Sequence, residues 1–183
     1  MLRWLPLLLA LLMAPAQATE AGWALLRNGG QVVLLNHADA PGTGDPAGFE
    51  IGNCATQRNL SARGRQQAKR IGALFFARAA PVGQVLTSRY CRTRDTAEFA
   101  FGDSVLEDFE PLDQLSPDPE AAAAQIDATL ERILGYTGSG NLVMVTHPSN
   151  IEALTGVRPR DGEAVILARG EDSVSAAARI AFN

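Results

Sequence analysis

Two short apolar runs that each end at a histidine constrain the fold of this chain most strongly. Residues 32–35 are followed by Asn36 and His37, and residues 142–146 lead directly to His147. Continuous apolar runs of this length are typical of strands that are covered on both faces, as in parallel sheets. Parallel strands deliver their carboxyl ends to one edge of an open sheet. The two histidines are therefore expected to converge on a single crevice.

Helix and strand patterns alternate along the rest of the chain. A helix is expected from the N-cap Ser61 to Pro81, and another after the N-cap Asp118, with Pro119 at its first position. Residues 21–28 form a short mixed segment, and residues 103–113 an acidic loop. The other expected elements are a strand at 84–88, a helix at 92–101, a short helix after His147, a buried strand at 163–168 and a half-exposed antiparallel strand at 174–182. This order predicts one three-layer α/β/α domain with a mixed, mostly parallel central sheet.

Composition excludes several classes of protein. The 183 residues are 46% hydrophobic and 20% charged, which fits one globular domain rather than a disordered chain. The net charge of -4 predicts no general affinity for nucleic acid or for anionic lipid.

The N-terminus has the pattern of a secretory signal. Arg3 supplies a positive charge, residues 5–13 an apolar core, and residues 16–18 a small-x-small cleavage site. We therefore expect a signal peptide over 1–18 and a mature domain over 19–183, in the periplasm or secreted. No later segment approaches the roughly 20 apolar residues that a spanning helix needs, so stable membrane insertion is not expected.

Export would place the two cysteines, Cys54 and Cys91, in an oxidising compartment. A structural disulfide between them is the expectation, and two buried free thiols are the alternative. A bridge would tie the long Gly- and Pro-rich loop after His37 to the residue before Arg92.

Four motifs follow one another along the chain, and each contains a residue suited to binding or attacking a phosphoryl group. They are Asn36-His37-Ala38, Asn59-Leu60-Ser61-x-x-Gly64, Ser88-x-x-x-Arg92-x-x-x-Thr96-Ala97-Glu98, and Thr146-His147-x-x-Asn150. Together they resemble the histidine phosphatase superfamily, with its phosphoglycerate-mutase-like fold. The long loop, the exported context and the cysteine pair are similar to the small periplasmic branch of that superfamily.

The resemblance implies a role for each site residue. His37 would attack phosphorus and become transiently phosphorylated, Arg92 would grip the phosphate oxygens, and His147 would donate a hydrogen bond to them. Phosphoryl transfer needs mainly positioning and positive charge around the equatorial oxygens, and no metal or cofactor is implied. A carboxylic acid must protonate the leaving oxygen. Asp108 or Glu110 is the candidate, and a purely solvated acidic loop is the alternative.

The chain departs from the superfamily pattern around the nucleophile. Asn36 stands where an arginine normally clamps the phosphate, and Ala38 stands where glycine is usual. Asn36 offers amide donors but no charge, and each lost charge-assisted hydrogen bond costs about 1.5–3 kcal/mol. That loss corresponds to roughly ten- to a hundred-fold in rate. The pattern predicts an impaired or retuned phosphatase, with a catalytically inactive phosphate-binding protein as the alternative.

The substrate expected from the resemblance is a small phosphomonoester or a phosphorylated envelope sugar. A metal site built from both histidines is a further alternative, although no pair of histidines has helical spacing. Arg58, Arg63 and Arg89 lie near the motifs and are expected to be surface or supporting residues.

Overall fold

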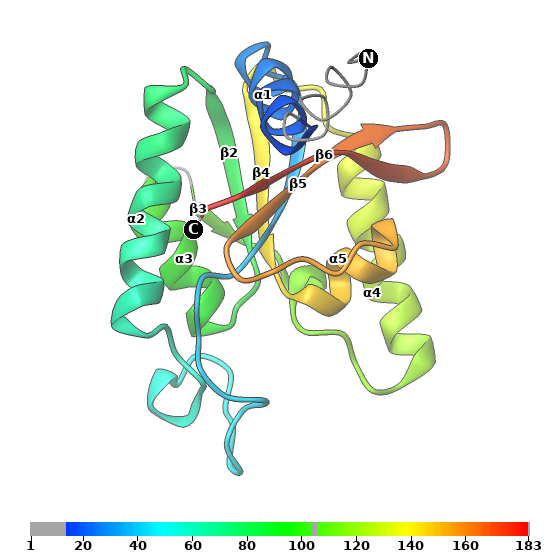
Figure 1. Cartoon of the computed structure of the whole chain (residues 1–183). Helices are drawn as coiled ribbons and strands as arrows, with labels where there is room; N and C mark the ends of the chain where they lie inside the picture. The colour runs from blue at the N-terminus through cyan, green and yellow to red at the C-terminus, as the bar shows by residue number, and fades with distance from the viewer. Residues whose placement is uncertain (1–13, 104–105, 183) are drawn as a thin grey trace, which may run out of the picture.

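The structure, a computed structural model, describes residues 14–103 and 106–182 (Figure 1). The described strands form one six-stranded sheet in the order β3-β2-β4-β1-β5-β6. The strands are β1 (Val32–Asn36), β2 (Val82–Thr87), β3 (Leu106–Asp108), β4 (Asn141–Thr146), β5 (Glu163–Arg169) and β6 (Val174–Ala181). The helices are α1 (Ala14–Arg27), α2 (Ala62–Ala77), α3 (Cys91–Phe101), α4 (Pro119–Leu134) and α5 (Pro148–Thr155).

The sheet is mixed, as predicted. β3, β2, β4 and β1 run parallel to one another, whereas β5 pairs antiparallel with both β1 and β6. The four parallel strands carry the site, because their carboxyl ends share one edge of the sheet. The β5–β6 hairpin closes the other side of the sheet.

Two apolar cores, one on each face of the sheet, give the three layers visible in Figure 1. α1, α2 and α3 cover one face, and α4 and α5 cover the other. All five residues of β1 and all six residues of β4 are buried. Burial on both faces explains why these strands are continuous apolar runs rather than alternating patterns.

Both predicted helix starts are confirmed by their caps. The Ser61 side chain accepts a hydrogen bond from the amide of Gly64. The Asp118 carboxylate accepts one from the amide of Ala121, and Pro119 follows in the first turn. These caps satisfy backbone donors that the first turn of a helix leaves without partners.

The helix α1 was not predicted from the sequence, because the apolar residues of this helix continue those of the expected signal peptide. Trp23 and Leu26 of this helix are buried, and the Trp23 ring contacts Phe75 and Phe182 edge-on, with centroids 5.6 and 6.0 Å away. Trp23 and Leu26 therefore belong to the apolar core of the domain. The signal peptide stays a prediction, because most of the segment 1–18 lies outside the described residues.

The short edge strand β3 was also missed, since it lies in the segment expected to be an acidic loop. Its three residues pair with β2, and two of them are exposed acids. A segment this short cannot show the periodic pattern of apolar residues from which a strand is predicted. None of the helices that the structure describes combines the length and the apolar character needed to span a membrane.

We expect Trp23→Ala to lower the free energy of unfolding by about 3–5 kcal/mol, because it empties a buried aromatic site. Arg27→Gln, at an exposed position on the same helix, is the control and should change it by less than about 0.5 kcal/mol. Urea unfolding of both variants is the measurement. Equal effects would show that α1 is not part of the cooperative domain.

Candidate active site

The register between β1 and β4 brings the two histidines together. Asn36 pairs with Thr146, so the next residue of each strand, His37 and His147, leaves the sheet at the same level. The His37 amide donates to the Thr146 carbonyl at 3.1 Å, which extends the ladder by one residue. The two rings meet edge-on with centroids 5.7 Å apart, and both side chains are buried. The predicted convergence of the strand ends is therefore present.

His37 has the protonation pattern of a nucleophile. Its Nδ1 lies 2.8 Å from the carbonyl oxygen of Ala38, which only accepts, so Nδ1 carries the proton. The lone pair is then on Nε2, which is buried without a hydrogen-bond partner. Burial, followed by the charges of Arg92 and Arg58, outweighs the Ala38 hydrogen bond and lowers the pKa of His37 to about 4. The ring is neutral at pH 7, with its lone pair available.

The two histidines line a pocket of about 380 Å³, a size that accommodates a small organic phosphate. The pocket is open to solvent on one side and is lined mainly by polar groups. Its other lining residues are Gly42, Thr43, Gly44, Arg58, Gln114, Pro148, Ser149, Arg158 and Asp161.

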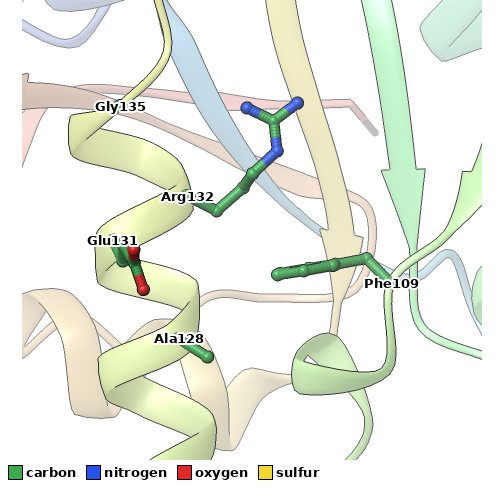
Figure 2. Close-up of a pocket in the computed structure, with 5 residues that line it drawn as sticks. All are labelled: Phe109, Ala128, Glu131, Arg132 and Gly135. Carbon is green, nitrogen blue, oxygen red and sulfur yellow. The ribbon is translucent and has the colours of Figure 1, made fainter.

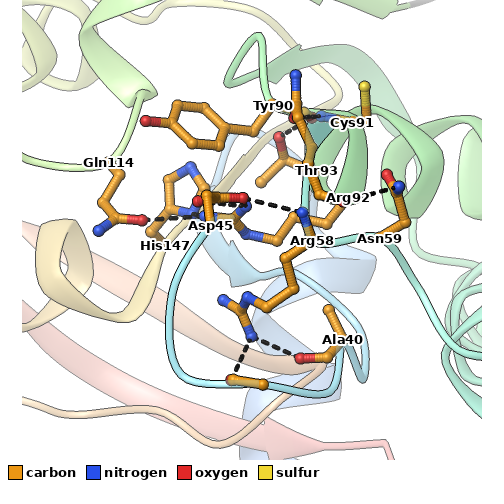
Figure 3. A network of polar contacts seen from close by, with 12 residues as sticks. Ala40, Asp45, Arg58, Asn59, Tyr90, Cys91, Arg92, Thr93, Gln114 and His147 are labelled. Atoms are coloured by element: carbon orange, nitrogen blue, oxygen red, sulfur yellow. Dashed lines mark hydrogen bonds and ion pairs between the residues drawn. The ribbon is translucent and has the colours of Figure 1, made fainter. Parts of the chain in front are cut away.

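Arg92 places a fully buried cation beside the histidines (Figure 3). One terminal nitrogen donates to both oxygens of Asp45, at 2.9 and 3.1 Å. The other donates to the amide oxygen of Gln114 at 3.0 Å and to Nδ1 of His147 at 3.3 Å. The guanidinium also lies over the Tyr90 ring, 4.6 Å from its centroid. Its Nε is buried without a hydrogen-bond partner.

His147 is held by a chain of polar contacts that begins at Asp113. Because Arg92 only donates, Nδ1 of His147 accepts, and Nε2 then donates to the Ser88 hydroxyl at 3.0 Å. Ser88 in turn donates to Asp113 at 3.0 Å. Burial first, and then the nearby Arg92, lower the pKa of His147 well below its usual value. The ring is fixed in place and neutral in the empty pocket.

Two motif residues position the backbone beside His37. The Thr96 hydroxyl accepts from the Ala38 amide at 3.0 Å and donates to the carbonyl of Arg92 at 2.7 Å. Gly64 lets α2 approach the loop, since a Cβ there would overlap the carbonyl oxygen of Asp39. Ala38 needs no glycine, because Ala79 is the one non-glycine residue of the described chain with a positive φ.

Besides the Asp45–Arg92 ion pair, three contacts attach the long loop after His37 to the start of α3. Cys54 and Cys91 form the predicted disulfide, with Cα atoms 5.6 Å apart. The Gln57 side chain accepts from the Cys91 amide at 2.9 Å. Phe49 stacks on Tyr90, with ring centroids 4.9 Å apart. These contacts fix the loop next to Arg92.

The structure does not bring every predicted site residue into the pocket. The Asn36 amide nitrogen donates to the Arg160 carbonyl at 2.9 Å and lies 3.5 Å from an Asp161 oxygen. Asn36 is fully buried and is not part of the pocket lining. Asp108 and Glu110 lie outside it as well. Asp108 pairs with Arg94 at 2.8 Å and Glu110 with Arg89 at 3.0 Å.

Several residues of the site, among them Arg58, Asp45 and Asp161, were not predicted from the sequence. Arg58, expected to be a surface or supporting residue, lines the pocket, and Asp161 lines it from the turn before β5. Asp45 forms the ion pair with Arg92. None of the three lies on a regular element, so no periodic pattern marked them. The proximity of Arg58 to the second motif was the one available signal.

The described residues contain no cluster of three or more histidine, cysteine, aspartate or glutamate side chains that could hold a metal ion. Another surface hollow, of about 440 Å³, lies between Phe109 and the last turns of α4 (Figure 2). Its lining contains Glu131 and Arg132 but no histidine. The chemistry is therefore concentrated in the pocket at the carboxyl edge of the sheet.

No protein-family model matches the chain, and no curated protein matches its sequence significantly. Solved structures do match. A putative alpha-ribazole-5'-P phosphatase from Escherichia coli superposes with a TM-score of 0.65 at 14% identity, over 82% of this chain and 96% of that one. The putative phosphohistidine phosphatase SixA from Agrobacterium tumefaciens gives 0.58 at 19% identity, over 82% and 97%. A mutant phosphoserine phosphatase from Entamoeba histolytica, in complex with phosphoserine, gives 0.58 at 13%, over 81% and 95%.

These neighbours are members of the histidine phosphatase superfamily, and the chain has their phosphoglycerate-mutase-like fold. The predicted fold class is confirmed.

Removing the disulfide by Cys54→Ser with Cys91→Ser should lower the free energy of unfolding by about 3–4 kcal/mol, from the entropy of closing a loop of 37 residues. The measurement is urea unfolding of the double variant beside the oxidised wild type. Adding a reductant should lower wild-type stability by a similar amount and leave the double variant unchanged. A reductant effect on the double variant would refute this explanation.

Acid should destabilise the protein partly through His37. The pKa of His37 is about 4 in the folded protein and near 6.5 in the unfolded chain. Between these two pH values, His37 is protonated in the unfolded chain but neutral in the native protein. Stability falls as pH drops through that window, by about 2 kcal/mol between pH 7 and 5. His37→Gln should reduce the measured loss by that amount. An identical loss in the variant and the wild type would contradict the assignment.

Proposed function

We propose that the protein is an exported phosphatase that hydrolyses phosphomonoesters through a phosphohistidine at His37. The observation that carries the proposal is the neutral, partnerless Nε2 of His37 in a pocket that His37 shares with His147. Arg92 does not line the pocket, but it lies next to it and donates to His147. Burying a nitrogen whose lone pair accepts no hydrogen bond costs free energy, so such an atom indicates a functional role. The structural neighbours are named as phosphatases, which supports the same chemistry.

The reaction has two steps. Nε2 of His37 attacks phosphorus, the N–P bond forms, and the P–O bond to the leaving alcohol breaks as that oxygen takes up a proton. Water then attacks the phosphohistidine, the N–P bond breaks, and inorganic phosphate leaves. Arg92 and His147 stabilise the charge on the equatorial oxygens in both steps. A phosphate dianion beside His147 favours the doubly protonated ring, which can donate from Nδ1.

The proton for the leaving group has to come from a carboxyl at the pocket. Asp108 and Glu110 were the predicted donors, but each pairs with an arginine outside the pocket. Asp161 lines the pocket, and burial, followed by the charge of Asp39, raises its pKa. We therefore assign the proton donor to Asp161.

The proposed substrate is a small phosphomonoester or a phosphorylated envelope sugar, met in the periplasm or outside the cell. The pocket volume suits such a molecule, and the predicted signal peptide and the disulfide support export. Asn36 in place of arginine removes one charged donor of the superfamily pattern but leaves the nucleophile His37 in place.

A catalytically inactive phosphate-binding protein is the second candidate. It is favoured by one observation: the Asp45 carboxylate already neutralises the cation of Arg92. Such a protein would show a higher melting temperature with inorganic phosphate and no turnover.

We expect the protein without residues 1–18 to release phosphate from p-nitrophenyl phosphate in the presence of EDTA, with inhibition by vanadate. His37→Ala should lower kcat/KM by at least about a thousand-fold, because it removes the atom that forms the covalent intermediate. Arg70→Gln, at an exposed position on α2, is the control and should keep wild-type activity. Equal activity of His37→Ala and the wild type would refute the mechanism.

A further inference from the structure

We propose that Arg58 supplies the second cation that grips the phosphate, in place of the arginine that Asn36 replaces. The inference rests on the proposed function, since it concerns an anion bound in the same pocket. The phosphate is then bound by two arginines, Arg58 and Arg92, although position 36 carries no arginine.

Asn36 itself cannot take over the missing contact. Its amide nitrogen is engaged by the Arg160 carbonyl at 2.9 Å and lies 3.5 Å from Asp161. Its side chain is fully buried outside the pocket lining. The amide therefore supports the turn before β5 and offers no donor to a ligand.

Arg58 is held over the pocket by the loop that follows the nucleophile (Figure 3). One terminal nitrogen donates to the carbonyls of Ala40 and Gly42, at 2.5 and 3.1 Å. Its backbone amide donates to Asp45 at 3.0 Å. These bonds to main-chain and loop acceptors fix the guanidinium, so little conformational entropy is lost when it binds an anion.

The Nε of Arg58 is buried without a hydrogen-bond partner. Among the described residues, the buried side-chain atoms in this state are Nε of Arg58, Nε of Arg92, Nε2 of His37 and Oδ1 of Asn36. His37 and Arg58 line the pocket, and Arg92 is bonded to the lining residue His147. Two N–H donors and one lone pair on residues in or next to this pocket are therefore unpaired. This set matches a tetrahedral oxyanion, whose oxygens accept from both arginines while its central atom faces the histidine.

The charge of Arg58 acts on the same atoms. After the larger effects of burial, it contributes to lowering the pKa of His37, of Arg92 and of His147. Asp45 is the carboxylate bonded to Arg92 and to the Arg58 amide, and it cancels one of the two positive charges. Arg92 paired with Asp45 thus leaves no net positive charge for a phosphate, and Arg58 supplies one.

The test compares Arg58→Gln and Arg58→Lys with Arg70→Gln as the matched control. We expect Arg58→Gln to lower kcat/KM by roughly ten- to a hundred-fold. It should weaken inhibition by inorganic phosphate by a similar factor, while Arg58→Lys keeps the charge and recovers part of both. Melting temperatures identify any variant whose loss comes from unfolding, and phosphate affinity is compared only between folded variants.

Phosphate affinity also separates this inference from the proposed function. If the wild type has no turnover but Arg58→Gln binds phosphate more weakly than Arg70→Gln in calorimetry, Arg58 is the phosphate cation and the phosphatase proposal fails. If the wild type is active and Arg58→Gln keeps its kcat/KM and phosphate inhibition within two-fold of the control, the Arg58 proposal fails and the phosphatase proposal stands.

Discussion

The buried charge of Arg92 is the constraint on which the rest of the site depends. A guanidinium without solvent exposure is costly unless its donors are paired. Asp45, Gln114 and His147 accept from it, and Tyr90 lies against its face. The three acceptors come from three segments that are distant from Arg92 in sequence. The need to satisfy one cation therefore fixes the loop after β1, the segment before α4 and the end of β4 relative to α3.

The parallel sheet supplies the second half of the arrangement. β4 lies between β1 and β2, so Thr146 pairs with Asn36, and Val145 pairs with Thr87. The residues that follow these strands, His37, His147 and Ser88, therefore leave the sheet side by side. The disulfide then binds the long loop to the residue before Arg92. Buried elements and the disulfide therefore hold His37, Arg92 and the loop after His37 in place, and this arrangement does not depend on a bound ligand.

The sequence was sufficient for the fold class and for the convergence of the two histidines. The positions of His37 and His147 could be predicted because each directly follows a buried strand, and Arg92 was singled out because it is the fifth residue of the Ser88-x-x-x-Arg92 motif. Arg58, Asp45 and Asp161 could not, since they lie in irregular segments whose paths are set by tertiary contacts such as the Gln57–Cys91 bond. The same reasoning explains α1. Its buried residue Trp23 contacts Phe75 and Phe182, which lie far along the chain. The residues next to Trp23 in sequence do not distinguish α1 from the expected signal peptide.

The departure at Asn36 is informative for the same reason. A comparison of motifs counts the arginine missing at position 36 as a lost charge. Phosphate binding, however, requires a cation at the right place in space, and a residue elsewhere in the sequence can supply it. Arg58 reaches the pocket from a loop and is anchored by the Ala40 carbonyl. The electrostatics of phosphate binding can thus be restored from a different segment, while Asn36 fulfils a structural task beside Arg160.

The central claim is that Nε2 of His37 forms a bond to phosphorus. The most direct measurement is to mix the protein with a phosphomonoester, quench at alkaline pH, where phosphohistidine survives, and determine the mass of the peptide that contains His37. The account predicts one added phosphoryl group on that peptide, at His37, and none in His37→Ala. Turnover of the substrate with no phosphoryl group at His37, or with one on another residue, would contradict it.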